Sequence, residues 1–383
     1  MATTISHIAV HTHCNDLGGK VWNPAIRWTR KHAVFVTLQY STGSTGLGEC
    51  WCFDAAPDAL VAYLRTEVVP HFLGAPLDAV ADIANALIDK ATLTARHGIL
   101  ASALAGIDIA TWDVRARHAG QPLWQALTRV GSGSATVYAS GGLYGQGKTT
   151  TDLAQEMATL AARGFGLVKM KVGALPLPDD IARVNAVLAA LPPDTRLIID
   201  GVYRYGVDDA LRLFEALTTG QIEAFQSPTK ASDYAGMARL TRAGVPVMAT
   251  EAEYRPELHD RLVEEARVAF LQTAPIAAGG LSRVLALADQ VAQTETRLSL
   301  EVSSTAVALM AAIQAASAHP AIAHVEYHTV HTVFFDKLRL QPIPTDQSRV
   351  GPPDTPGLGI SLPGEGVTVA FEETSDPSPK DAA

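Results

Sequence analysis

The chain has 383 residues, of which 48% are hydrophobic and 18% are charged, and its formal net charge is -9. This composition is ordinary for a soluble enzyme-sized protein, and the negative charge argues against nucleic acid or an anionic membrane as a partner. No apolar run approaches the roughly 20 residues that span a bilayer, and the first residues lack the features of a signal peptide. Three cysteines do not form a disulfide framework, so we expect a reduced, cytoplasmic protein.

Residues 1–125 are predicted to form an α+β unit. Three strands of a small antiparallel sheet are expected at Ile5–His11, Ala33–Tyr40 and Gly46–Trp51. The loop from His13 to Arg30 is either a cover for a site or an ordinary connector. Three helical stretches follow, and the clearest, Ile99–Arg117, carries small residues that suit close helix packing.

A zinc site is an alternative use of several side chains in this first unit. The candidate ligands are His11, His13, Cys14, Cys50 and Cys52. Their spacing matches no standard zinc pattern, so we interpret them as partly buried strand residues.

From Val137 to about Thr329 the chain alternates short apolar strands with amphipathic helices, which predicts a barrel domain over residues 135–330. The eight predicted strands are Val137–Ser140, Leu167–Val172, Arg196–Asp200, Ile222–Gln226, Val245–Thr250, Val268–Gln272, Arg297–Glu301 and His324–Tyr327. Eight units at this period are the signature of a closed parallel β/α barrel. The fold class is therefore α/β, a modified eight-stranded TIM-type barrel with an N-terminal capping domain.

Two lysines lie inside the second of these strands, in Lys169-Met170-Lys171. Side chains alternate across a strand, so both ammonium groups point to one face. A buried lysine requires a partner, so carboxylates or a charged ligand are expected nearby. Such lysines can act as bases, although a structural pair at a strand end is the alternative.

Chemistry in a β/α barrel takes place at the carboxyl ends of the strands. Those ends carry Lys171, Asp200, Gln226, Glu251, Glu301 and Glu326. The C-terminal segment, about residues 345–371, is expected to complete the cap with a strand at Val367–Phe371. Residues 372–383 are polar and are expected to be a disordered tail.

Five motifs resemble the enolase superfamily in its mandelate racemase and muconate-lactonizing branch. They are Gly46-Leu47-Gly48-Glu49, the helix Ala105–Val114, Lys169-Met170-Lys171, Gly279-Gly280 and Pro356-Gly357-Leu358-Gly359-Ile360. The resemblance runs nearly end to end. It implies removal of a proton next to a carboxylate and stabilisation of the resulting enolate by magnesium.

The resemblance places the magnesium ligands at Asp200, Gln226 and Glu251. The middle carboxylate of the family is an amide here, and Val202 replaces a companion asparagine. Since glutamine adds no negative charge, we expect a magnesium site that is weak or lost. The alternative is that Asp200 and Glu251 pair with Lys169 or Lys171.

The family's racemases carry an Asp–His dyad opposite the lysines, and those positions are Ala274 and Glu301 here. A two-base racemase is therefore not expected. Lys171 is the predicted base, Lys169 tunes it, and Glu301 is a general acid or a partner for a lysine. A Schiff base on Lys171 is a further option.

Three more side chains are predicted to bind substrate, namely Glu326, Arg204 and Lys230. The chain is interpreted as a lyase or isomerase (a dehydratase, epimerase or cycloisomerase) acting on a small organic acid or sugar-derived molecule. The alternative is a catalytically silent barrel that binds a metabolite or acts in an assembly. The expected partner is a small-molecule substrate, and the chain is expected to form a homo-oligomer.

Overall fold

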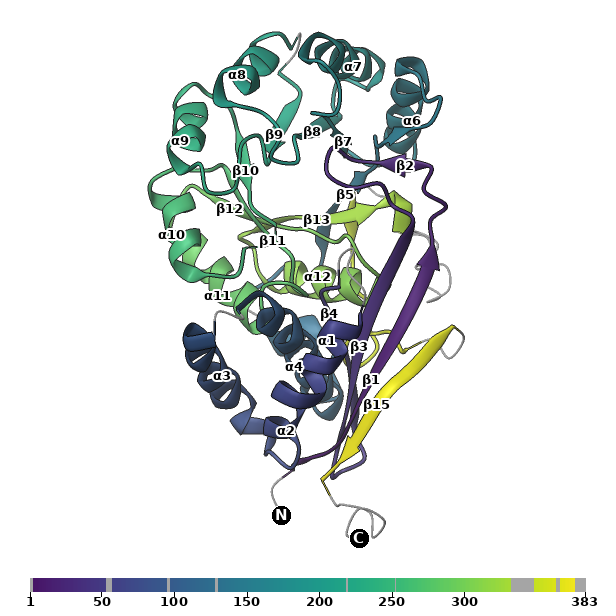
Figure 1. Cartoon of the computed structure of the whole chain (residues 1–383), viewed down its shortest axis with the longest axis vertical. Helices are drawn as coiled ribbons and strands as arrows, with labels where there is room; N and C mark the ends of the chain where they lie inside the picture. The colour runs from purple at the N-terminus through teal and green to yellow at the C-terminus, as the bar shows by residue number, and fades with distance from the viewer. Residues whose placement is uncertain are drawn as a thin grey trace.

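The computed structural model describes residues 3–52, 57–94, 97–127, 130–217, 220–251, 253–331, 348–362 and 366–375. A barrel and a cap are visible, with the cap sheet running alongside the barrel (Figure 1). Within the described residues, no helix has the length and apolar character needed to cross a membrane.

The barrel confirms the predicted order of eight parallel strands. They are β5 (Ala135–Ser140), β7 (Leu167–Lys171), β8 (Arg196–Asp200), β9 (Ile222–Gln226), β10 (Val247–Ala249), β11 (Phe270–Thr273), β12 (Arg297–Leu300) and β13 (Ile322–His328). Each pairs with the next, and β13 closes the ring on β5 with Val325 opposite Val137. The fifth strand begins later than predicted, because Pro246 has no N–H to donate to the ladder.

Helices follow the strands and cover the outside of the barrel (Figure 1). They are α6 (Thr150–Ala162), α7 (Leu177–Ala190), α8 (Val207–Glu215), α9 (Tyr234–Arg242), α10 (Pro256–Glu264), α11 (Leu281–Val291) and α12 (Ala306–Ala318). Local signals set their ends: α6 begins at a reciprocal capping box between Thr149 and Asp152. The barrel interior is filled by apolar side chains that include Tyr138, Ile198 and Met248. The barrel is therefore a packed core and not an open channel.

The cap is a four-stranded antiparallel sheet with helices on one side. Its strands are β1 (Ile5–Asp16), β3 (Arg30–Tyr40), β4 (Thr45–Cys50) and β15 (Val367–Thr374), in the order β15-β1-β3-β4. Its helical segments are α1 (Asp58–Tyr63), a π-helical turn (Leu64–Val68), α2 (Val69–Phe72), a 3-10 turn (Leu77–Ala79), α3 (Val80–Thr94), α4 (His97–His118) and α5 (Leu123–Leu127). A second apolar core lies between this sheet and the helices α1 to α4, whereas Leu123 and Leu127 of α5 belong to the barrel core.

The C-terminal segment contributes to both units. The short strand β14 (Arg349–Val350) pairs with β5 of the barrel, and β15 pairs with β1 of the cap. The predicted tail begins too early: β15 continues to Thr374, because β1 offers backbone partners as far as His7. Residues 376–383 of that predicted tail lie outside the described residues.

Close packing of β4 on α4 holds the sheet of the cap against its longest helix. A Cβ atom added at Gly46 would lie 2.1 Å from the carbonyl oxygen of Ala110, and one at Gly48 would lie 2.0 Å from that of Gly106. Only glycine allows this approach. The prediction of close packing along this helix is thus confirmed, and the same strand delivers the buried Glu49 to the barrel.

The loop between β1 and β3 reaches the carboxyl ends of the barrel strands. Its short strand β2 (Val21–Trp22) pairs with β6 (Tyr144–Gly145), which follows the first barrel strand. The ring of Trp28 lies 5.2 Å from that of His328, at the end of β13. The loop therefore lies over the carboxyl ends of the barrel strands, which favours the covering interpretation over that of an ordinary connector.

Candidate functional site

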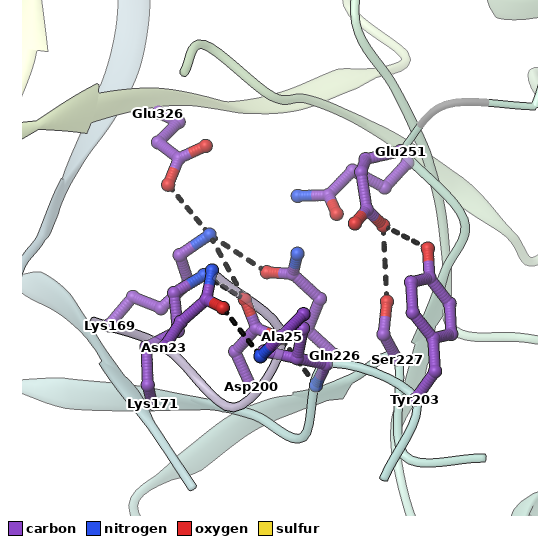
Figure 2. A network of polar contacts seen from close by, with 12 residues as sticks. Asn23, Ala25, Lys169, Lys171, Asp200, Tyr203, Gln226, Ser227, Glu251 and Glu326 are labelled. Atoms are coloured by element: carbon purple, nitrogen blue, oxygen red, sulfur yellow. Dashed lines mark hydrogen bonds and ion pairs between the residues drawn. The ribbon is translucent and has the colours of Figure 1, made fainter. Parts of the chain in front are cut away.

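The lysine motif lies at the end of β7, and register places its charged neighbours on the next two strands. Lys171 is opposite Asp200 of β8, and Asp200 is opposite Gln226 of β9. Side chains of this group point toward one another at the mouth of the barrel (Figure 2). The sequence prediction that these strand ends converge is therefore confirmed.

Lys169 is the centre of the polar network, and it is only 1% exposed. Its Nζ atom lies 2.6 Å from Oε1 of Glu326, 3.0 Å from Oε1 of Gln226 and 3.6 Å from Oδ2 of Asp200 (Figure 2). Burial acts to lower the pKa of Lys169, but the charges of Glu326 and Asp200, the nearby Tyr138 and the hydrogen bond to Glu326 together outweigh burial and raise the pKa well above its ordinary value. Lys169 is thus a permanently charged group.

Glu326 is the carboxylate partner of Lys169. Burial acts to raise its pKa, yet the positive charges of Lys169 and Lys171 hold that pKa below its ordinary value. Its second oxygen accepts a hydrogen bond from the backbone N–H of Val302 at 3.2 Å. Glu326 is therefore an ionised group tied to the loop that follows β12.

Lys171 lies closer to the opening than Lys169. Its side chain is 9% exposed, against 1% for that of Lys169. Nζ of Lys171 donates to Oδ2 of Asp200 at 2.5 Å, and the backbone N–H of Val202 donates to Oδ1 of the same carboxylate at 3.0 Å. The alternative that the carboxylate pairs with the lysines is confirmed for Asp200.

Glu251 has hydroxyl partners instead of a lysine. Its Oε2 accepts hydrogen bonds from the Tyr203 hydroxyl at 2.5 Å and the Ser227 hydroxyl at 3.1 Å (Figure 2). Burial, and next the charge of Glu251, raise the pKa of Tyr203, which keeps this donor protonated. Val202, Tyr203 and Ser227 all have positive φ angles of 45–61°. Such conformations cost energy in non-glycine residues and gather at functional sites.

The three predicted metal ligands do not fit a magnesium ion in this arrangement. Magnesium requires hard oxygen ligands in a near-octahedral shell. Oxygens of Asp200, Gln226 and Glu251 already accept hydrogen bonds from lysines, a backbone N–H or hydroxyls. Within the described residues, no three His, Cys, Asp or Glu side chains are grouped to hold a metal ion. The cap histidines and cysteines weighed as zinc ligands are among these described residues.

Glu301 follows β12, three strands around the closed barrel from β7. Burial, and next the charges of Glu326 and Glu251, raise its pKa to about 8. Its Oε2 atom is buried and has no hydrogen-bond partner among the described residues. The group is therefore a protonated acid with an unused oxygen at neutral pH. Ala274, the position of the missing aspartate, is fully buried.

The predicted substrate-binding residues Arg204 and Lys230 lie apart from this network. The guanidinium of Arg204 donates twice to the carbonyl oxygen of Pro24 in the cap loop, from Nη2 at 2.6 Å and from Nε at 3.2 Å. Lys230 is exposed on the loop after β9, where its carbonyl oxygen accepts from the N–H of Asp233. Arg204 is thus a link between the barrel and its cover.

Several residues of the site were not selected from the sequence. Lys31 of β3 is 2% exposed, and its charge acts on Glu301 and on His328. Burial, followed by the charges of Lys171 and Lys169, lowers the pKa of His328 well below its ordinary value, so its ring is neutral. Lys31 lies in the polar start of β3, Arg30-Lys31-His32, so the sequence did not distinguish it from an ordinary exposed lysine.

A buried group behind β7 fixes the position of Lys171. The Asp180 carboxylate accepts from the backbone N–H of Gly173 at 2.7 Å and from the hydroxyls of Tyr144 and Tyr205 at 2.7 and 3.0 Å. Arg183 bonds both Asp180 and the carbonyl oxygen of Lys171. The end of β7 is therefore fixed by Asp180 and Arg183, which bond its backbone, and by Asp200, which pairs with the side chain of Lys171.

Comparison with known proteins agrees with this architecture. Residues 25–128 match the mandelate racemase / muconate lactonizing enzyme N-terminal domain, and residues 152–366 match the enolase C-terminal domain-like family. A D-galactarolactone cycloisomerase of Agrobacterium fabrum is 28% identical over 377 residues, which cover 94% of this chain and 97% of the relative.

Two further relatives extend the comparison. An arabinonate dehydratase of Saccharolobus solfataricus is 25% identical over 346 residues, which cover 88% of this chain and 91% of the relative. The solved structure of a racemase from Streptomyces coelicolor with bound magnesium superimposes with a TM-score of 0.84 at 22% identity, covering 94% of this chain and 98% of that one. At 22% identity, the similarity to this solved structure shows a shared fold.

Proposed function

We propose that this chain, which belongs to the mandelate racemase and muconate-lactonizing branch of the enolase superfamily, removes the α-proton of a small sugar-derived acid or lactone as a lyase or isomerase. Relatives that span nearly the whole chain are named as a cycloisomerase and a dehydratase of such molecules, which supports the substrate class. The observation that carries the proposal is the pair Lys169 and Lys171, both directed into the barrel mouth with Glu301 three strands away.

Lys171 is the proposed base because it is the more open of the two lysines. It accepts a proton only as a neutral amine, so before turnover its ammonium group releases a proton to solvent and the ion pair with Asp200 opens. The α C–H bond then breaks, the proton moves to Nζ of Lys171, and the electron pair forms an enolate. Correct placement of such a base contributes typically about 100-fold to 10,000-fold in rate.

Glu301 is the proposed general acid. Its pKa of about 8 keeps it protonated at neutral pH, and its buried Oε2 has no other hydrogen-bond partner among the described residues. When the enolate collapses, the bond between the β-carbon and its oxygen breaks, and Glu301 gives its proton to that oxygen. The oxygen leaves as water in a dehydration, or stays on the same molecule when a ring opens.

The arrangement favours proton transfer on one side of the substrate. The dyad positions hold Ala274, which cannot accept a proton, and Glu301, which is an acid at neutral pH. A racemase needs a base on each face, whereas elimination needs one base and one acid. This asymmetry supports a lyase or cycloisomerase above a two-base racemase.

A silent, ligand-binding barrel is the second candidate. The observation in its favour is that Asp200 accepts from Lys171 at 2.5 Å, so the proposed base is held in an ion pair. A protein of this kind would bind a sugar acid without moving any of its protons.

Solvent proton exchange separates the two candidates. The protein is incubated in heavy water with a panel of aldonic and aldaric acids and their lactones, and each mixture is followed by proton NMR. The proposal expects deuterium at a single α-position or a dehydrated keto product. Loss of the signal in Lys171→Ala, with retention in Lys90→Met on the exposed face of α3, assigns it to the site. A panel without any exchange would move the silent barrel into first place.

A further inference from the structure

The strand ends surround one lysine ammonium in the way that they would surround a metal ion. Asp200, Gln226 and Glu326 come from β8, β9 and β13, and their oxygens lie 2.6–3.6 Å from Nζ of Lys169. The ring of Tyr138 from β5 lies 5.4 Å from the same nitrogen. Five strands of the barrel, including β7 itself, thus contribute to one closed cage around a positive charge.

We infer that Lys169 is the resident cation of this site and that the protein acts without a divalent metal. The inference rests on the proposed function for its catalytic part and on the cage alone for its binding part. The charge that stabilises the enolate oxygen then comes from the chain itself. An ammonium group placed where negative charge develops acts by the same electrostatic principle as a metal.

The contacts of the cage match an ammonium group. The three oxygens lie at hydrogen-bond or ion-pair distances, whereas magnesium requires oxygens at about 2.0–2.1 Å. A metal at this position would displace Nζ of Lys169, which is 1% exposed. A buried charge that loses its partner is strongly destabilising. The cage therefore disfavours a metal ion at the position of Nζ as long as Lys169 is present.

The balance of formal charge leads to the same conclusion. Lys169 and Lys171 carry two positive charges, and Asp200 and Glu326 carry two negative charges. Gln226 is neutral and uses its oxygen to accept from Lys169. Glu251 lies outside the cage and accepts from Tyr203 and Ser227 instead, so a divalent ion in the cage would need a carboxylate at the position where the chain has the amide of Gln226. The amide at position 226 and the placement of Lys169 in the cage are thus consistent with each other, because the amide oxygen accepts a hydrogen bond from the lysine.

Magnesium binding tests the inference without any substrate. Isothermal titration with magnesium chloride and thermal unfolding with and without it are measured on the natural chain, Gln226→Glu, and Lys169→Met combined with Gln226→Glu. The natural chain is expected to show neither saturable heat nor a shift in Tm, and EDTA is expected to leave its Tm unchanged. The double variant, in which the cage has lost its cation and gained a carboxylate, is expected to bind magnesium and to unfold at a higher temperature when magnesium is added.

Matched controls make each outcome decisive. Lys90→Met combined with Gln226→Glu keeps the cage lysine and is expected to bind magnesium at least about tenfold more weakly than the double variant, by analogy with the effect of ligand charge at calcium sites. If the double variant fails to fold, the magnesium titration and the thermal unfolding of the natural chain and of the single variant Gln226→Glu still test the inference. Saturable magnesium binding by the natural chain, or a Tm that falls in EDTA, overturns the inference.

The same experiments distinguish this inference from the proposed function. Magnesium binding by the natural chain would remove the resident-cation role and leave proton abstraction by Lys171 intact. A substrate panel without proton exchange would remove the function and leave the metal-free cage intact. For any substrate that is turned over, the rate is expected to be unchanged in EDTA, and a loss of activity that magnesium restores would contradict the inference.

Discussion

Lys171 and Asp200 form an ion pair of 2.5 Å at the mouth of the barrel, and Lys169 shares the same carboxylate oxygen at 3.6 Å. One carboxylate therefore orients two lysines with different surroundings. Lys169 is enclosed by Asp200, Gln226 and Glu326, whereas Lys171 keeps some exposure to the opening. In the proposed mechanism, this difference makes Lys169 the fixed charge and Lys171 the group that carries the proton.

The first prediction concerns the base. Lys171→Ala is expected to lower proton exchange by about 100-fold to 10,000-fold, which is the usual contribution of a general base. Lys171→Arg is expected to lose as much, because a guanidinium stays protonated at neutral pH. Exchange rates are measured by NMR in heavy water, with Lys90→Met as the control. Full activity in either Lys171 variant would place the base elsewhere.

The second prediction concerns the loop that covers the site. Arg204→Ala removes both hydrogen bonds to the Pro24 carbonyl oxygen, so the loop between β1 and β3 is expected to open more often. Hydrogen exchange of residues 17–29, followed by mass spectrometry, is expected to speed up while the global Tm changes little. Arg204→Lys keeps one donor and is expected to give an intermediate rate. Unchanged exchange in Arg204→Ala would show that the pairing of β2 with β6 holds the loop by itself.

The third prediction concerns the contact between cap and barrel. Glu49 is fully buried and accepts from Ser304 Oγ at 2.5 Å, Thr305 Oγ1 at 2.6 Å and the Ala308 N–H at 3.0 Å, at the start of α12. Glu49→Ala leaves these donors without a partner. We expect a loss of about 2–4 kcal/mol in the free energy of unfolding, since a buried unsatisfied group costs about 1–3 kcal/mol.

Chemical denaturation measures this effect, and exposed Glu67→Ala in the same domain serves as the control. Glu49→Gln keeps the shape of the side chain and is expected to lose less. Because Ser304 and Thr305 belong to the loop that follows Glu301, the variant is also expected to lower the rate. A stability equal to that of Glu67→Ala would show that water replaces the carboxylate without cost.

The barrel was predictable because its signals are local and repeat. Each strand is a short, largely apolar run that ends in a polar residue or is directly followed by one. The alternation of side chains along a strand fixes the face of Lys169 and Lys171. The convergence of Asp200 and Gln226 with those lysines then follows from the closed ring. The C-terminal limit of β15 was placed too early, because its last residues are polar and only the partner strand β1 decides where pairing ends.

The details of the site depended on contacts that no local pattern encodes. Tyr203 reaches Glu251 because the loop after β8 turns through positive φ angles at Val202 and Tyr203, which a sequence with valine there does not suggest. Arg204 lies next in the chain and instead bonds Pro24, 180 residues away. Partner choice across such separations is decided by tertiary packing.

The last prediction concerns Glu301 and pH. Its pKa is about 8 in the folded chain, against 4.5 for an ordinary glutamate. Between these values the folded state holds a proton that the unfolded state releases, so this group's contribution to stability is complete below about pH 4.5 and is lost as pH rises through about 8. Glu301→Gln keeps the neutral form at every pH. Its Tm relative to that of the natural chain is therefore expected to rise between pH 5 and about pH 9.

The pH dependence of activity tests the protonation state of Glu301 independently. If Glu301 donates a proton to the leaving oxygen, kcat falls as pH rises through about 8, and Glu301→Gln eliminates slowly at all pH values. Removal of the α-proton by Lys171 does not need this acid, so deuterium exchange in Glu301→Gln is expected to persist. Exposed Glu67→Gln controls for the loss of one carboxyl group. A difference in Tm that stays constant with pH would show that Glu301 is ionised in the folded protein and pairs with a lysine.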